Sequence, residues 1–573
     1  MTDERRGVVA RVNGPLVEVD GMAGVAMAEM VDLGAQHIPA EVVAISGSRT
    51  TLQAYEYTGG VAPGTAATRL GQGLSATMGP WLLGGVFDGL LRPLPRGPIW
   101  LPPATSEETA SRTWPWRPLV KPGDPASRGA TLGALGLDGG VEYLVLVPAF
   151  VDGRVSAVSP CGDYRADDEL ARVDDIAVTM TTRWPIRRPR PYVRRLRTDE
   201  PLVTGQRVLD NLFPLTLGGT AAVPGGFGTG KTLLLQQVAK WCSADVIVYV
   251  GCGERGNEMS DLLEDFTELV DPRSGGLLAH RTVIVANTSN MPMMARESSV
   301  YSGITVAEHF RDMGYRAVVI ADSTSRWAEA LREFSSRSGA MPAEEGYPAD
   351  LSSSIAAFYE RAGAVVTLGG TTGSVTVIGA VSPPGGDLSE PVTTLTQRYV
   401  RGLWTLDHDL AYARHYPAVS WSGSFARDTA QVDAWYARNG EPGWGRRRAR
   451  LADLLAEGDR LAALAELMGA TSLPDRERVA LVASRLVREA VLQQSAVDAN
   501  DAYCTPAKGA ALADFALDAS DECRAAVDRG VPAATLENFD FSNLLRAARE
   551  TPPDDAAEIQ RRRAVLLDAL KAL

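Results

Sequence analysis

The sequence predicts a multidomain α/β protein with four parts in order along the chain. These are an N-terminal β-barrel, a β-rich insertion, a parallel sheet covered by helices, and a C-terminal helical domain. Three observations predict them: short alternating apolar runs near the N-terminus, strand–helix alternation from about residue 200, and the loss of strand patterns after about residue 436. The 573 residues suffice for about three to five domains.

The barrel is predicted over residues 1–75. Apolar and polar residues alternate there in short runs separated by glycine, as in Gly7–Val12 and Leu16–Val19. Several short strands at regular spacing are typical of a small β-barrel. Residues 76–94 then connect the barrel to the core.

The insertion is predicted over residues 95–183. Proline and tryptophan dominate residues 93–130, which excludes a single helix or a central strand. Two later runs, Val141–Val147 and Val173–Thr179, are expected to be strands. The insertion is therefore expected to be mostly β.

The nucleotide-binding core is predicted over residues 184–435, beginning with a Pro/Arg-rich linker that ends near Arg197. Short apolar strands alternate with helical segments, which indicates a parallel sheet with both faces covered. The expected strands are Thr220–Val223, Val246–Val250, Thr282–Ala286, Ala317–Ala321, Ala364–Leu368 and Thr376–Ala380. The expected helices are Thr232–Cys242, Gly256–Val270, Ser299–Met313 and Arg326–Ser336.

The helical domain is predicted over residues 436–573, where Ala, Leu, Arg and Glu recur with helical periodicity. Its expected helices are Ala449–Leu467, Asp475–Ala499, Ala510–Arg529 and Ala556–Ala572.

Composition argues against several other classes of protein. The net charge of −13 and the pI of about 5.1 disfavour a general nucleic-acid binder, and the basic residues at 187–195 are expected to belong to a linker. The five cysteines are scattered without a CxxC pair, so we expect neither a zinc site nor a disulfide framework. The polar N-terminus does not resemble a signal peptide, and no apolar run is long enough to span a membrane.

One motif carries the clearest chemistry, a complete GxxxxGK[ST] loop between an apolar strand and a helix. Glycines let backbone N–H groups turn inward around phosphate oxygens, and the helix N-terminus adds partial positive charge. The lysine is expected to reach the β and γ phosphates, and the final threonine to bind Mg²⁺. The loop consists of Gly225, Gly226, Phe227, Gly228, Thr229, Gly230, Lys231 and Thr232.

Two carboxylates follow predicted strands. Asp322 ends the apolar run Val318–Ala321, which is the Walker B pattern, and is expected to hold Mg²⁺ through water. Glu254 leaves the end of Val246–Val250 and is a candidate to orient the attacking water; a solvated loop glutamate is the alternative. Arg255 is expected to hold neighbouring charge or to sense the γ phosphate.

At these residues the chain resembles the catalytic A subunit of V-type and archaeal-type rotary ATPases. The resemblance rests on the phosphate loop and on long matches elsewhere, and it extends over nearly the whole chain. The insertion matches the bulge that marks the A subunit. The further matching segments are Gly205–Asp210, Gly251–Met259, Ala321–Glu333, Glu344–Pro348 and Ser382–Asp387.

The resemblance implies roles and partners. Lys231, Glu254 and Arg255 would be catalytic, Tyr416 would pack on adenine, and Phe425 would complete that pocket. ATP or ADP would bind with Mg²⁺. Three copies would alternate with three B subunits, each giving an arginine, in an A3B3 hexamer joined by central and peripheral stalks to a membrane ring that moves H⁺ or Na⁺. The chain would lie at the cytoplasmic face of the membrane and bind no nucleic acid.

Some positions depart from the family pattern. Gly226 stands where Pro or Ala is usual, which predicts a more flexible loop, and Ser354 stands where Arg is frequent. Three alternatives stay open: a nucleotide-binding subunit that does not hydrolyse ATP, a ring-shaped nucleic-acid motor, and the ATPase of a secretion or flagellar export system. Glu254 argues against the first alternative, and the bulge argues against the other two.

Overall fold

The computed structural model describes residues 6–94, 112–137, 140–271, 275–338 and 341–573. Two compact units divide the chain. Unit 1 comprises Met1–Leu196 and Ala244–Gly379, and unit 2 comprises Arg197–Ser243 and Ala380–Leu573. Each unit therefore contains part of the predicted nucleotide-binding core.

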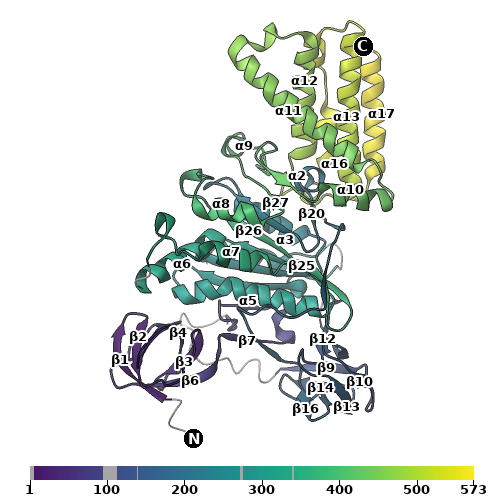
Figure 1. Cartoon of the computed structure of the whole chain (residues 1–573). Coiled ribbons are helices and arrows are strands. Elements are labelled where there is room, and N and C mark those ends of the chain that lie inside the picture. The colour runs from purple at the N-terminus through teal and green to yellow at the C-terminus, as the bar shows by residue number, and fades with distance from the viewer. Residues whose placement is uncertain (1–5, 95–111, 138–139, 272–274, 339–340) are drawn as a thin grey trace. The chain divides into compact units, whose positions relative to one another are not determined.

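Unit 1 begins with a closed six-stranded barrel in the order β1-β2-β5-β4-β3-β6 (Figure 1). Alternate side chains along each strand point inward, so that Val17, Val19 and Leu52 are fully buried. The predicted barrel is confirmed. Its strands are Arg6–Asn13, Leu16–Asp20, Glu29–Leu33, Ile38–Ser46, Arg49–Ala54 and Ala66–Gly73.

The insertion forms two four-stranded antiparallel sheets, with Trp114 and Trp116 buried. The single strand predicted over Val173–Thr179 is wrong, because Asp174 takes a φ of 49° and turns the chain. Two strands, β15 and β16, pair across that turn. Residues 95–111 of the Pro/Trp-rich stretch lie outside the described residues. The two sheets are β9 (Thr113–Pro118), β11 (Thr131–Gly136), β12 (Glu142–Leu146) and β14 (Gly162–Arg165), and β10 (Pro125–Ala126), β13 (Gly153–Val158), β15 (Ala171–Val173) and β16 (Ile176–Val178).

The sheet of unit 1 is parallel through five strands, in the order β8-β23-β22-β24-β26, and an antiparallel pair, β25 and β18, continues from β26. Nearly every side chain of the central strands is buried, as expected for a sheet covered on both faces. Helix α5 packs against β22 and β24 and begins six residues before the predicted start. The strands are β8 (Val86–Phe87), β18 (Arg194–Leu196), β22 (Val246–Glu254), β23 (Thr282–Thr288), β24 (Arg316–Asp322), β25 (Gly363–Val366) and β26 (Thr372–Val381); the helices are α4 (Gly256–Glu268), α5 (Met293–Asp312), α6 (Thr324–Ser338) and α7 (Leu351–Tyr359).

The basic segment at 187–195 pairs with acids of the same unit. Arg187 forms ion pairs with Glu41 of the barrel at 2.5 Å and with Glu297 of α5 at 2.7 Å. Arg190 pairs with Asp312 at 2.6 Å. These pairs support the interpretation of the segment as an interdomain linker.

Unit 2 carries the phosphate-loop strand and the helical domain. Strand β21 pairs in parallel with β27, which pairs with β28, and helix α3 follows β21. The elements are α2 (Arg207–Leu212), β21 (Thr220–Pro224), α3 (Lys231–Trp241), α8 (Pro391–Tyr399), β27 (Gly402–Leu403), α9 (His408–Tyr412), β28 (Phe425–Ala426) and α10 (Thr429–Arg438).

Long helices of unit 2 pack side by side, α12 and α17 each against α13 (Figure 1). The helix predicted over Asp475–Ala499 is shorter than expected: α12 passes into a π-helical turn, Val487–Leu492, and Gln493 is extended. Within the described ranges, no helix combines the length and apolarity needed to cross a bilayer. The long helices are α11 (Trp444–Met468), α12 (Asp475–Leu486), α13 (Pro506–Asp528) and α17 (Ala556–Lys571).

Candidate nucleotide-binding site

The phosphate loop lies between β21 and α3, as its motif predicts. Gly230 caps the N-terminus of α3 with a φ of 85°, and Gly228 has a φ of 79°. Both conformations are left-handed and strain any side chain with a Cβ. The motif's glycines at these two positions therefore allow the backbone to turn into the helix.

Close contacts hold the loop in this shape. A Cβ at Gly225 would lie only 2.8 Å from Leu406 and from the Thr229 hydroxyl. The Thr229 hydroxyl donates to the Gly226 carbonyl at 2.9 Å, and the Lys231 ammonium donates to the Gly225 carbonyl at 2.5 Å. Lys231 thus folds back over the concave side of the loop, where phosphate oxygens bind in loops of this kind.

Gly226 differs from the other loop glycines. Its φ lies outside the left-handed region, and a Cβ there would meet its nearest neighbour, Gly386, at 3.7 Å. The backbone at this position therefore has both the conformation and the space for a larger residue. Within the described part of the chain, no neighbouring atom requires glycine at this position, and the greater flexibility of the loop stays a prediction.

An aromatic ring covers one side of the loop. A Cβ at Gly230 would lie 3.2 Å from the Tyr416 ring, so Tyr416 packs directly against the start of α3. Phe425 lies in β28 opposite Leu403, and the Arg427 guanidinium lies 5.2 Å from the centre of its ring. The adenine-binding roles of both aromatic residues stay predictions.

The two predicted carboxylates meet at the carboxyl ends of β22 and β24 in unit 1. Asp322 ends β24 opposite Gly251 of β22 and is 2 % exposed. The register of β22 against β23 shifts between Cys252 and Glu254, where Gly253 has a φ of 74°. This bulge redirects Glu254, which is typical of bulges beside active sites.

Burial and like charges act on Glu254. They raise the pKa of its carboxyl to about 8. Burial makes the largest contribution, the charges of Asp322 and Glu258 follow, and the charge of Arg326 lowers the pKa. A carboxyl with a pKa near neutrality can accept a proton during turnover, which is the requirement for a general base. Arg255, next in sequence, is 66 % exposed and lies 4.0 Å from Glu258.

Two residues to which the sequence analysis gave no role change the surroundings of these acids. The Tyr249 hydroxyl donates to Asp322 Oδ2 at 3.1 Å, and burial with the charge of Asp322 raises the pKa of Tyr249 well above its usual range. Tyr249 therefore stays a neutral donor. Glu258 lies in a matching motif, but its effect on Glu254 needed the helical geometry of α4.

Thr232 of unit 2 and Asp322 of unit 1 each offer an oxygen of the kind that binds Mg²⁺. No cluster of three or more His, Cys, Asp or Glu residues suited to a metal occurs in the part of the chain that the structure describes. Mg²⁺ in phosphoryl-transfer sites usually takes one or two protein oxygens and completes its shell with phosphates and water. The Thr232 hydroxyl and the Asp322 carboxylate are donors of this type.

The loop geometry and its lysine are those of a phosphate-loop nucleotide-binding domain. Comparison with known families agrees. Residues 205–426 match the ATP synthase alpha/beta family, nucleotide-binding domain, and residues 433–533 match the C-terminal domain of V and A type ATP synthase. Residues 9–71 match the beta-barrel domain of the same family, and residues 107–187 match the ATPsynthase alpha/beta subunit barrel-sandwich domain.

Full-length relatives narrow the assignment. The V-type ATP synthase alpha chain of Anaeromyxobacter sp. (strain K) is 48 % identical over 99 % of both chains. The A subunit of the A-type ATP synthase of Methanopyrus kandleri is 44 % identical over 97 % of this chain and 96 % of the relative. The chain therefore belongs to the family of V-type ATP synthase alpha chains and A-type ATP synthase A subunits, and the resemblance drawn from its motifs is confirmed.

A more distant solved structure shares the fold. The assembled ATPase EscN from the enteropathogenic E. coli type III secretion system superposes with a TM-score of 0.63 at 20 % identity, covering 90 % of this chain and all of EscN. At that identity the likeness concerns the fold alone.

Proposed function

We propose that this chain is the catalytic subunit of a V/A-type rotary ATPase, which hydrolyses or synthesises Mg-ATP and couples that reaction to H⁺ or Na⁺ translocation. The observation that carries the proposal is the intact phosphate loop in a chain that is 48 % identical to a V-type ATP synthase alpha chain. Glu254 lies partly buried at a strand end beside like charges, which is typical of groups that transfer protons in catalysis.

In this proposal, each site residue has one task. Loop N–H groups and Lys231 bind the β and γ phosphates, and Arg255 contacts the γ-phosphate region. Glu254 orients the attacking water and accepts its proton. Tyr416 packs on the adenine, with Phe425 beside it.

Thr232 holds the metal directly, and Asp322 holds it through water. Mg²⁺ held there would supply positive charge against the developing negative charge of phosphoryl transfer. Its positive charge beside Asp322 also favours the ionised form of Glu254, because an opposite charge nearby lowers a carboxyl pKa. Glu254 would therefore be a better base when the metal is bound.

The active site is completed by a partner. In the proposed complex, a B subunit supplies a transition-state arginine in an alternating A3B3 hexamer, and stalk subunits join the hexamer to a membrane ring. The chain would then act as a peripheral component of the complex, at the cytoplasmic face of the membrane. The isolated chain is expected to be a poor ATPase.

The experiment is ATP hydrolysis by the complex purified from membranes, followed by ATP-driven uptake of H⁺ and Na⁺ into vesicles. Hydrolysis that drives uptake of one ion, and that fails with Lys231→Ala, is the expected result. ATPase activity stimulated by RNA or DNA would instead indicate a nucleic-acid motor. Copurification with export proteins in place of stalk subunits would indicate a secretion ATPase.

A further inference from the structure

A network of buried hydrogen bonds in unit 2, centred on Gln494 and Arg207 and called the junction below, is bonded to the backbone of Tyr416. The Tyr416 carbonyl accepts a hydrogen bond of 2.8 Å from the backbone N–H of Gln494, which follows the π-helical turn. The ring of the same tyrosine packs against Gly230 of the phosphate loop. One residue therefore contacts the loop through its side chain and the helical domain through its backbone.

The oxygen and both N–H groups of the Gln494 side-chain amide form hydrogen bonds at this junction. The side chain is 4 % exposed. Its oxygen accepts a hydrogen bond from the backbone N–H of Arg207 at 2.8 Å. Its amide nitrogen donates to the backbone carbonyl of Gly205 at 2.9 Å and to the backbone carbonyl of Asp501 at 2.8 Å. An amide has one such acceptor and two such donors, so glutamine at this position is specified by its surroundings.

Arg207 anchors the other side of the junction. It is 1 % exposed, and its guanidinium donates to the Val491 carbonyl at 2.7 Å, to the Gln493 carbonyl at 2.5 Å and to Asp501 at 2.5 Å. These carbonyls are at the end of the π-helical turn, where backbone acceptors lack helical partners and the helix dipole favours a cation. The start of α2 is thus fixed to the end of α12 and its π turn.

Further bonds tie the same turn to the residues around Tyr416. The His415 Nε2–H donates to the Arg488 carbonyl at 3.1 Å, and the Gln493 amide donates to the Arg414 carbonyl at 3.3 Å. The position of the Tyr416 segment therefore depends on the π-helical turn.

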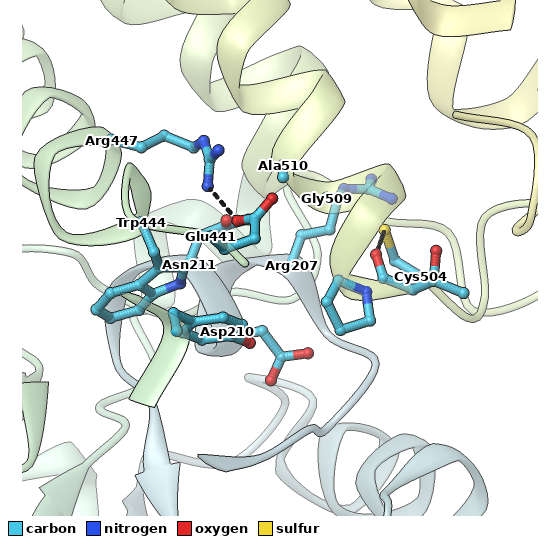
Figure 2. A pocket seen from close by; sticks show the side chains of 12 residues that line it. Arg207, Asp210, Asn211, Glu441, Trp444, Arg447, Cys504, Gly509 and Ala510 are labelled. Carbon is cyan, nitrogen blue, oxygen red and sulfur yellow. Dashed lines mark hydrogen bonds and ion pairs between the residues drawn. The ribbon is translucent and has the colours of Figure 1, made fainter. Parts of the chain in front are cut away.

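The neighbouring cavity offers no competing explanation for these polar groups. Arg207, Asp210 and Cys504 line it together with Glu441 and Arg447, which are joined by an ion pair (Figure 2). Its volume of about 20 Å³ has space for little more than one water. It is too small for a ligand, so the buried polar groups serve the contact between α2 and the helical domain.

We propose that Gln494 and Arg207 are positioning residues that hold Tyr416 at the adenine side of the nucleotide site and couple adenine binding to the π-helical turn of the helical domain. This inference rests on the proposed function, because it takes the Tyr416 ring to contact adenine. A substitution of Gln494 is then expected to weaken binding of the nucleotide base. Binding of the triphosphate is expected to stay unchanged, because the loop binds it through its own N–H groups and Lys231.

The test is a double-mutant cycle in the purified complex with Gln494→Leu and Tyr416→Ala. Gln494→Leu is expected to raise KM for Mg-ATP by about tenfold, with kcat within about threefold, because a binding contact is lost in ground and transition states alike. Inhibition by Mg-tripolyphosphate, which has no base, is expected to stay within about twofold. Gln494→Leu is expected to add nothing in the Tyr416→Ala background, since coupled residues are not additive.

Controls separate positioning from general damage. Gln560→Leu changes an exposed glutamine of the same helical domain and is expected to have no effect. An additive cycle, an equal loss of tripolyphosphate inhibition, or an unchanged KM in Gln494→Leu would overturn the inference. If Lys231→Ala keeps wild-type hydrolysis, the proposed function itself fails, whereas an additive cycle with inactive Lys231→Ala refutes only the positioning role.

A measurement on the unaltered protein covers the case in which Gln494→Leu does not fold. The backbone N–H of Gln494 is bonded to Tyr416, so its hydrogen exchange reports on that contact. ADP is expected to slow this exchange in the wild-type complex, and tripolyphosphate is expected to leave it unchanged. Equal exchange with and without ADP contradicts the proposal.

Discussion

Glu254 provides the most direct test of the proposed chemistry, through Glu254→Gln. This substitution keeps the size of the side chain and removes its ability to accept a proton. General-base catalysis contributes about 10²–10⁴-fold, so kcat is expected to fall by that factor while nucleotide still binds. The assay is steady-state ATP hydrolysis by the purified complex, together with binding of a fluorescent ADP analogue. Hydrolysis at the wild-type rate in Glu254→Gln would refute the assignment of the base.

The pH dependence of kcat/KM gives a quantitative test of Glu254 as the general base. With a pKa of about 8, only about one Glu254 carboxyl in ten is ionised at pH 7 in the free enzyme. Because kcat/KM reports the free enzyme, it is expected to rise about tenfold from pH 6 to pH 7 and to level off above pH 8. The acidic limb of kcat is expected at lower pH, since bound Mg²⁺ favours the carboxylate.

Glu258→Gln is the matched control for this profile. The Glu258 charge raises the pKa of Glu254, so its removal is expected to move the acidic limb of kcat/KM to lower pH without abolishing turnover. A limb that stays in place in Glu258→Gln would show that another group titrates.

Four further outcomes are expected. Lys231→Ala should lower kcat/KM by about 10²–10³-fold in the hydrolysis assay, because a positioned phosphate contact is lost. Gly226→Ala should keep activity within about twofold, whereas Gly228→Ala places a Cβ at a φ of 79°, costs about 1–2 kcal/mol and should weaken nucleotide binding measured by calorimetry. Lys508→Met leaves three buried carbonyls without the Lys508 ammonium and should destabilise the chain to urea by about 1–3 kcal/mol. Glu254→Gln should raise the melting temperature at pH 8 but not at pH 4. The pKa of Glu254 is higher in the folded than in the unfolded chain, so the folded protein loses stability as the pH rises from the unfolded pKa to the folded pKa. Glutamine does not ionise, so the variant does not lose this stability.

The parts of the site that the sequence predicted are those specified by local geometry. The loop glycines at 228 and 230 are needed because the backbone there is left-handed, which is a property of one turn. Asp322 was predicted because a buried parallel strand places its last residue at the sheet edge used for ligands. The barrel was predicted for a similar reason, since alternation along one strand is enough to show an inward face.

Tertiary contacts account for what the sequence did not predict. Nothing in the alternation of β22 shows that Tyr249 donates to Asp322, because that bond joins strands more than seventy residues apart. The helix expected to continue to Ala499 ends at Leu492, although its composition stays compatible with a helix. Arg207 satisfies two carbonyls at that end, and a cation placed there by a distant segment leaves no trace in local periodicity.

The same reasoning explains why the motif Gly205–Asp210 was matched to the family without a role for its residues. Asp210 accepts three hydrogen bonds from Thr204 and Gly205, which fixes the turn before α2, the helix that begins with Arg207. Arg207 then meets Asp501 and the π turn, almost three hundred residues later. The motif Gly205–Asp210 lies near the phosphate loop in sequence, but its hydrogen bonds and ion pair attach α2 to the helical domain. If that attachment controls Tyr416, substitutions at Arg207 should change nucleotide affinity while leaving the loop intact.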